Sequence, residues 1–374
     1  MRKVIYGVSS ILILTVSYLL FWPIPIDPLA WTPQKNPGFT GPYHRNNLMS
    51  EAKMYPLPFG KGPEDTAIGS DGKIYTGLDD GSVVRFSLGN GSPIETIINT
   101  AGRPLGLKFF NNRLYIADAY KGLIYIDDAI LEKGHKVQVA TDTVNNEKMI
   151  FVDDLDIASD GTVWFSDAST RFDLHNNVLN YMEQRPSGRL LSWNPKTNET
   201  RVHLEGLGFA NGVALGPNET YILVNETMFY RIRRYWIKGE KSGQTDVFIE
   251  NLPGFPDNLT YNKSGLFWVA LIFPRQEKID SLLPNPFLRK VIMRLPESLR
   301  VSEPEPMGWI IAVDLSGVVV HNLQDHTGRI YTVTSVNEFD ESLWLGSLTA
   351  PNIARLPVPR VHNSTGAIRP LKSP

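Results

Sequence analysis

Six short segments of this chain follow one pattern, in which a turn rich in Gly, Asp or Asn leads into an apolar, β-prone run beside an aromatic residue. A second β-like run follows each of them. The first runs lie at 71–75, 112–115, 160–164, 218–222, 264–268 and 340–344, and the second runs at 83–86, 123–126, 189–193, 230–235, 310–313 and 353–356. A unit of several strands that recurs every roughly forty to fifty residues is typical of a propeller blade. The sequence therefore predicts an all-β fold, a six-bladed β-propeller around a central channel.

The N-terminus predicts a transmembrane helix in addition. Arg2 and Lys3 precede an uncharged apolar stretch from Val4 to Trp22. As a helix this stretch would span about 28 Å, close to the thickness of one hydrocarbon core. We expect residues 1–22 to be a signal anchor with a cytoplasmic start, which makes the chain a single-pass type II membrane protein whose propeller lies in the lumen of the secretory pathway or outside the cell. The alternative is a cleaved signal peptide, which would release a soluble secreted protein.

The remaining chain divides by composition. Residues 23–60 are rich in Pro, Gly and Asn and predict a stalk that leads into the first blade; the propeller is expected over 61–360, and residues 361–374 form a C-terminal tail. The connection between Trp268 and Trp344 is longer than the others. It predicts an amphipathic helix from about Asn285 to Leu295, which would be a lid over the channel, an element that touches a membrane, or a helix packed on its own blade.

Composition also excludes some classes of function. A net charge of −2 without a basic run predicts no nucleic-acid partner. The absence of Cys excludes disulfides, thiolate metal sites and a cysteine nucleophile. Asn-x-Ser/Thr sequons support export, and glycosylation is predicted at Asn198, Asn218, Asn225, Asn262 and Asn363.

Polar residues stand before four of the strands that are expected to line the channel. They are Glu64 with Asp65, Asp153 with Asp154, Asn211, and Asp257 with Asn258. Inner strands of a propeller meet around its axis, so these side chains can converge although they are distant in sequence. Carboxylate and amide oxygens are hard donors of the kind that Ca²⁺ prefers. The alternative is that these residues only form turns, which is the commoner role of Asp and Asn before strands.

Several longer motifs carry a resemblance to a known family. They lie at 62–64, 71–77, 151–155, 164–170, 187–191, 209–213, 231–234 and 253–258, the last reading Pro-Gly-Phe-Pro-Asp-Asn. Residues 62–356 resemble the strictosidine synthase-like propellers, whose wider superfamily includes paraoxonases, gluconolactonases and phosphotriesterases with a catalytic Ca²⁺ at the channel mouth. The resemblance implies that Ca²⁺ is the cofactor.

The resemblance also assigns roles to single residues. It implies that the metal ligands are Glu64, Asp153, Asn211, Asp257 and Asn258. Asp153 stands where the family has Asn, and a third carboxylate would bind a cation more tightly but weaken it as a Lewis acid. Asp257 or Asp153 would act as general base or nucleophile. Asp65 and Asp154 would orient ligands or help to hold a second ion. If Asn258 binds metal, its own sequon is unavailable.

Two departures narrow the expected chemistry. Leu105 stands where paraoxonases have a histidine, and Thr334 stands where strictosidine synthases have their catalytic glutamate, so alkaloid condensation is not expected. The sequence and the resemblance together predict a Ca²⁺-dependent, arylesterase-like hydrolase of small ester or lactone substrates. The alternative is a non-enzymatic, membrane-anchored receptor or adhesion module with a structural Ca²⁺ and a protein partner.

Overall fold

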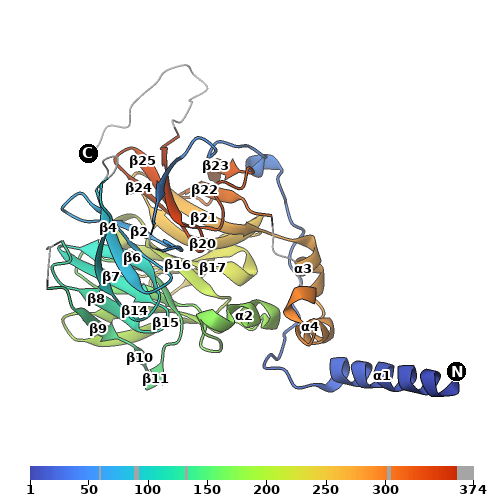
Figure 1. Cartoon of the computed structure of the whole chain (residues 1–374). Helices are drawn as coiled ribbons and strands as arrows, with labels where there is room; N and C mark the ends of the chain where they lie inside the picture. Colours follow the sequence, from blue (N-terminus) through green and yellow to red (C-terminus); the bar gives the residue numbers. More distant parts are fainter. Residues whose placement is uncertain (59, 88–91, 131–133, 301–304, 360–374) are drawn as a thin grey trace.

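The chain folds as a six-bladed β-propeller in the computed structural model, which describes residues 1–58, 60–87, 92–130, 134–300 and 305–359. The described residues form six four-stranded antiparallel sheets arranged around one axis (Figure 1). Each sheet runs from an innermost to an outermost strand, and the first five blades use consecutive strands of the chain. The predicted fold class is confirmed.

The strands of each blade follow the predicted repeats. Blade 1 contains β2 (Thr66–Ile68), β3 (Ile74–Gly77), β4 (Ser82–Phe86) and β5 (Glu95–Asn99); blade 2 contains β6 (Pro104–Phe110), β7 (Arg113–Asp118), β8 (Gly122–Ile126) and β9 (Val137–Thr141); blade 3 contains β12 (Val152–Ile157), β13 (Val163–Asp167), β14 (Gly188–Asn194) and β15 (Glu199–Leu207). Blade 4 contains β16 (Ala210–Leu215), β17 (Tyr221–Glu226), β18 (Arg231–Trp236) and β19 (Thr245–Ile249); blade 5 contains β20 (Gly254–Tyr261), β21 (Leu266–Pro274), β22 (Gly308–Asp314) and β23 (Val319–Asp325). A separate hairpin joins β10 (Thr143–Val144) to β11 (Glu147–Lys148).

The sixth blade closes the ring with a strand from the other end of the chain. It contains β24 (Val333–Phe339), β25 (Ser342–Ser347), β26 (Asn352–Pro357) and, on its outer edge, β1 (Lys53–Pro56). Lys53 pairs with Arg355 and Pro56 with Asn352. The prediction of a stalk over 23–60 therefore needs a correction, because its last part is a propeller strand. This pairing satisfies the free edge of β26, which would otherwise leave backbone groups unpaired.

The aromatic residues of the repeats pack between neighbouring blades. Trp268 and Trp344 end two of the predicted runs, and both are almost fully buried, as is Trp309 of β22. Tyr221 of blade 4 lies against Phe267 of blade 5 with ring centroids 6.4 Å apart. Burial of one such side chain contributes about 3 kcal/mol, so a ring of these contacts stabilises the inter-blade core.

The described residues form four α-helices outside the blades. α1 (Arg2–Phe21) is exposed from Lys3 to Tyr18, and among the described residues it is the one helix that is long and apolar enough to be a candidate membrane span. α2 (Asn177–Glu183) lies between β13 and β14. α3 (Glu277–Leu282) and α4 (Pro286–Met293) lie between β21 and β22, and α4 confirms the helix predicted in the long connection. In Figure 1 α2, α3 and α4 lie on the side of the propeller from which α1 projects.

Short 3-10 turns complete the described structure. They lie at Gly41–Tyr43, Leu174–Asn176, Pro217–Glu219, Thr227–Phe229 and Glu297–Leu299. The turn at Leu174–Asn176 leads directly into α2, where Asp173 accepts a hydrogen bond from the backbone N of Asn176 and caps the turn.

Candidate functional site

A bulge recurs at the same position in the inner strands. In blades 2 to 6 two consecutive residues of the inner strand face a single residue of the next strand. In blade 1 the equivalent residues, Glu64 and Asp65, directly precede β2. A bulge redirects side chains that a regular strand would point into the sheet. Each blade therefore offers two neighbouring residues to the axis.

The first residue of each pair lines one cavity. We call these six residues the cavity ring: Glu64, Leu105, Asp153, Asn211, Asp257 and Thr334. All six are buried. The structure thus brings together four of the five predicted metal ligands, although they come from four different blades. It also places Leu105 and Thr334 at the ring positions where the resemblance put a histidine and a glutamate.

The cavity above this ring has a volume of about 290 Å³ and apolar walls. The walls are formed by Phe151, Leu174, Val178, Tyr181, Met182, Phe209, Tyr230, Phe255, Ile272, Phe273, Ile279 and Leu348. Asn177, Gln184 and Gln276 add polar groups. Val178 is 53% exposed while the ring is buried, so the cavity reaches the surface beside α2. Polar groups at the buried end and apolar walls are typical of a small-molecule site.

Burial and mutual repulsion dominate the electrostatics of the ring. Burial raises the pKa of Glu64, and the neighbouring carboxyl of Asp153 raises it further. Burial also raises the pKa of Asp153, with Asp257 as the next cause. The pKa of Asp257 is raised by burial and by Glu64, while a hydrogen bond from Asn211 acts in the opposite direction. Three buried carboxyl groups that repel one another favour either protons or a bound cation.

Several oxygens at this end of the cavity have no protein partner. Within the described part of the chain, Glu64 Oε2, Asn211 Oδ1 and Asn258 Oδ1 are buried and accept no hydrogen bond. An unpaired buried acceptor is costly, and a cation satisfies such atoms. The described residues hold no group of three or more Asp, Glu, His or Cys side chains arranged as a metal site. The unpaired oxygens come from amide as well as carboxylate groups, and such hard donors fit Ca²⁺ better than a softer metal.

Asn258 occupies a different position from the other predicted ligands. It is the second residue of its bulge, and it does not line the cavity. Its Nδ2 donates a hydrogen bond of 2.8 Å to Glu64 Oε1, across from blade 5 to blade 1. Asn258 therefore holds the Glu64 carboxylate in place, and its Oδ1 accepts no hydrogen bond.

The second residues of the bulges join blades. Asp65 Oδ2 accepts a hydrogen bond of 3.0 Å from the backbone N of Leu107 in blade 2, and Asp154 Oδ2 accepts one of 2.8 Å from the backbone N of Val213 in blade 4. Asn337 donates to the other oxygen of Asp65 at 2.8 Å. Asp65 and Asp154, which were predicted to orient ligands or to help hold a second ion, thus accept hydrogen bonds from neighbouring blades.

Sequence reasoning missed part of the cavity. α2 was not predicted, yet it contributes Tyr181, whose ring lies against Phe209 and Phe255 with centroids 5.1 and 5.9 Å apart. Arg103 was also missed; it is buried near Glu64, and its charge acts to lower the pKa of that carboxyl. The unusually long connection between Asp167 and Gly188 was the available signal for α2.

One predicted glycosylation site is wrong. Asn225 lies in β17, is fully buried, and donates a hydrogen bond from Nδ2 to the backbone oxygen of Asp257. A glycan on that nitrogen would have to pass through the packed centre of the propeller. Asn225 instead supports the backbone of a cavity-ring residue.

The other predicted sequons differ in exposure. Asn198 and Asn218 are exposed in turns. Asn262 is half-buried, and its Nδ2 donates a hydrogen bond of 3.0 Å to Glu338. Asn363 lies outside the described residues. Glycosylation at these positions stays a prediction.

The fold and the cavity together define a six-bladed propeller with a buried oxygen-rich ring at one end of its channel. Two family descriptions match the chain: strictosidine synthase over residues 153–240, and the N-terminal part of strictosidine synthase-like proteins over residues 41–86. Adipocyte plasma membrane-associated protein of Mus musculus is 34% identical over 354 residues, covering 89% of this chain and 84% of the relative. Strictosidine synthase-like protein 4 of Arabidopsis thaliana is 33% identical over 342 residues, covering 89% of this chain and 88% of the relative.

The chain belongs to the strictosidine synthase-like family. Among solved structures, a gluconolactonase from Xanthomonas campestris has the same propeller fold with a TM-score of 0.58 and 15% identity; the match covers 90% of this chain and 99% of that one. At this identity the likeness concerns the fold alone.

Proposed function

We propose that this protein is a Ca²⁺-dependent hydrolase of ester or lactone bonds, anchored in a membrane by α1. The observation that carries the proposal is the cavity ring, in which buried carboxylates and unpaired amide oxygens lie beneath apolar walls. Such a cavity suits a substrate with an apolar body and one polarisable carbonyl group. The fold relation to a gluconolactonase supports the same class of reaction.

Residues of the cavity ring would bind the cation and transfer the proton. Glu64, Asp153, Asn211 and Asp257 would hold the cation, with Asn258 completing the set through Oδ1. When bound, Ca²⁺ would supply electrophilic polarisation of the carbonyl oxygen. Asp257 or Asp153 would take a proton from the attacking water as the water oxygen bonds to the carbonyl carbon. The C–O bond to the leaving alkoxide would then break, and the alkoxide would take that proton from the carboxyl group.

The reaction also benefits from the walls of the cavity. The ring of Tyr181 packs against Phe209 and Phe255, and these walls would exclude water from the buried end. Burial raises the pKa of Tyr181 well above its usual range, as do Asp257 and Asp153, so its hydroxyl stays protonated. The phenol thus serves as a neutral hydrogen-bond donor toward the substrate.

We infer that the anchor places the propeller on the exported side of a membrane. The basic residues Arg2 and Lys3 precede α1, which predicts a cytoplasmic N-terminus and a single-pass type II orientation. A relative named for its association with the plasma membrane supports this placement. N-terminal sequencing of membrane-purified protein tests it, because a mature start after Trp22 would contradict an uncleaved anchor.

The activity is tested with the full-length protein in detergent. Hydrolysis of phenyl acetate and of a small lactone is measured with Ca²⁺ and after removal of Ca²⁺ by a chelator. We expect activity that needs Ca²⁺ and falls about 100-fold or more in Asn211→Ala. Asn218→Ala, an exposed asparagine in the same blade, is the matched control and should keep full activity.

The outcomes separate the two candidate functions. A folded protein that gains thermal stability with Ca²⁺ but hydrolyses neither substrate would reject the hydrolase and support a binding module with a structural ion. Activity that persists in Asn211→Ala or in chelator would reject the metal-dependent mechanism.

A further inference from the structure

The segment that follows α1 in the chain is bound to the propeller. Arg294, directly after α4, donates hydrogen bonds to the backbone oxygens of Trp22 at 2.6 Å and of Leu19 at 3.1 Å. Arg289 of α4 is fully buried and donates to the backbone oxygen of Leu29. Two arginines of one short helical region therefore bind the C-terminal end of α1 and the segment after it.

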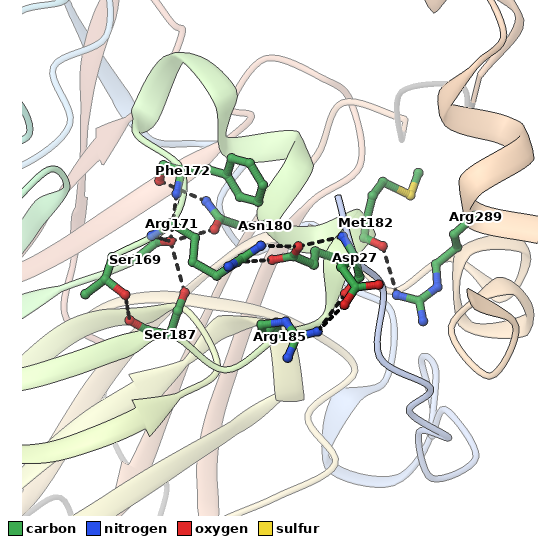
Figure 2. A network of polar contacts seen from close by, with 11 residues as sticks. Asp27, Ser169, Arg171, Phe172, Asn180, Met182, Arg185, Ser187 and Arg289 are labelled. Carbon is green, nitrogen blue, oxygen red and sulfur yellow. Dashed lines mark hydrogen bonds and ion pairs between the residues drawn. The ribbon is translucent and has the colours of Figure 1, made fainter. Parts of the chain in front are cut away.

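α2 binds the same segment from the other side. Glu183 accepts a hydrogen bond of 2.7 Å from the backbone N of Asp27, and its own backbone oxygen accepts one of 2.9 Å from Leu29. Arg185 forms an ion pair of 2.8 Å with Asp27, and Arg289 donates a hydrogen bond of 2.9 Å to the backbone oxygen of Met182 (Figure 2). The segment thus contacts both α2 and α4, and these two helices also contact each other directly through Arg289 and Met182.

Apolar packing reinforces these polar contacts. Ile26 of the bound segment, Met182 of α2 and Met293 of α4 form one buried cluster. Met182 also lines the cavity. The side chains that hold the exit of α1 are therefore continuous with the wall of the candidate active site, and the end of the anchor has a fixed position beside the opening of the cavity.

The same face carries exposed apolar side chains. Phe287 and Leu288 of α4 are 57% and 43% exposed, and Val178 at the opening of the cavity is 53% exposed. The opposite face of α4 is buried through Arg289 and Met293. A short helix with one buried face and one exposed apolar face, next to the end of a membrane helix, has the character of an interfacial element.

We propose that α2 and α4 dock on the lipid surface that holds α1, and that the cavity receives an amphiphilic ester or lactone directly from the bilayer. This inference rests on the anchor and the hydrolase proposed above. Because the segment after α1 is bound on both sides, the propeller cannot turn this face away without breaking the contacts of Arg289, Arg294 and Glu183. An acyl chain would lie along the apolar walls with its carbonyl group at the cavity ring.

Docking is tested by fluorescence, without any need for activity. The chain has no cysteine, so one label can be placed in Phe287→Cys of the full-length protein in phosphatidylcholine vesicles. We expect a lipid-borne quencher near the headgroups to remove roughly half of the fluorescence. Val139→Cys is the matched control: it is also 57% exposed, but it lies on β9 at the far side of the propeller from α4 (Figure 1). Equal quenching at the two positions, or none at residue 287, would overturn the docking.

The substrate class is tested with a double variant, Phe287→Ser and Leu288→Ser, neither of which lines the cavity. Turnover of a long-chain lactone dissolved in the vesicles should fall about tenfold, while hydrolysis of water-soluble phenyl acetate stays unchanged. An equal effect on both substrates, or none on the vesicle substrate, would overturn delivery from the bilayer. Quenching at residue 287 in a protein that hydrolyses neither substrate would reject the hydrolase and leave the docking intact.

Discussion

Two neighbouring positions of the same bulge have different surroundings in this propeller. Asp153 faces the cavity, and Asp154 beside it joins blade 3 to blade 4 through the backbone N of Val213. Glu64 and Asp65 repeat this arrangement in blade 1. Adjacent carboxylates with similar burial thus serve opposite purposes: one leaves oxygens available to a ligand, and the other is satisfied by backbone donors.

The second position also alternates around the axis. Blades 1, 3 and 5 carry Asp65, Asp154 and Asn258 there, and blades 2, 4 and 6 carry Gly106, Gly212 and Ser335. A Cβ on Gly106 would lie 2.5 Å from Asp154 Oδ1, and one on Gly212 would lie 2.6 Å from the Cα of Asn258. Asp154 and Asn258 therefore each need a glycine at this position in the preceding blade. The second position is therefore set by packing against the neighbouring blade, whereas the first position faces the cavity.

The largest expected effect is a loss of catalysis when a carboxylate of the cavity ring is replaced. Asp257→Asn keeps the size of the side chain and removes the carboxylate that would bind the proton or the cation. We expect kcat/KM for phenyl acetate to fall about 10²- to 10⁴-fold, with little change in melting temperature. Retained activity would show that Asp257 takes no part in the reaction, and Asp153→Asn would then decide whether the other carboxylate does.

The second-largest effect is expected on removal of Ca²⁺, which should lower the stability of the fold by an amount that depends on pH. Saturation at about 100 times Kd would stabilise the fold by about 2.7 kcal/mol. Burial raises the pKa values of Glu64, Asp153 and Asp257 above those of the unfolded chain. Without Ca²⁺, stability therefore falls as the pH rises from the unfolded pKa through the folded one, since the repelling charges form in the folded state.

Protons compete with Ca²⁺ for the same oxygens, so the rise in melting temperature on adding Ca²⁺ should be larger at pH 8 than at pH 5. A calcium effect that is independent of pH, or larger in acid, would indicate that the ion binds away from these carboxylates.

A matched pair of substitutions compares the two positions within one bulge. Asp154→Ala leaves the backbone N of Val213 unpaired and should lower the free energy of unfolding by about 1–3 kcal/mol. Asp153→Ala removes a repelling buried carboxylate and should cost little stability in chelator, but should weaken Ca²⁺ binding. Chemical denaturation and calcium titration of both variants test this, and equal stability losses would remove the distinction.

The smallest effect on stability is expected at Asn337, which contacts Asp65 and is not part of the cavity ring. Asn337→Ala removes the hydrogen bonds from Nδ2 to Asp65 and to Thr66. We expect a loss of about 1 kcal/mol of stability with unchanged calcium affinity. A clear drop in calcium affinity would show instead that Asp65 takes part in ion binding, as the sequence allowed.

Much of the fold and the site was predictable because the signals are local. Each blade repeats its own turn and apolar runs, so the number of blades follows from the sequence. The helix of the long connection is bounded by Pro286 and ends before Pro296, and α4 forms where this pattern predicts it. The inner-strand pairs, such as Asp257 with Asn258, also stand out as polar residues beside apolar strands.

Only the tertiary structure decided which of these residues face the cavity and which join blades. The bulge turns Asp153 toward the cavity and Asp154 toward blade 4. Two adjacent aspartates in the sequence do not indicate which of them will face the cavity. Contacts between distant segments were equally invisible: β1 closes the sixth blade, and Arg289 and Arg294 bind the chain after α1. Asn225 reads as a surface sequon but lies buried behind Asp257. The sequence determined the repeating unit through local propensity and periodicity, whereas burial and partners depend on how the blades meet.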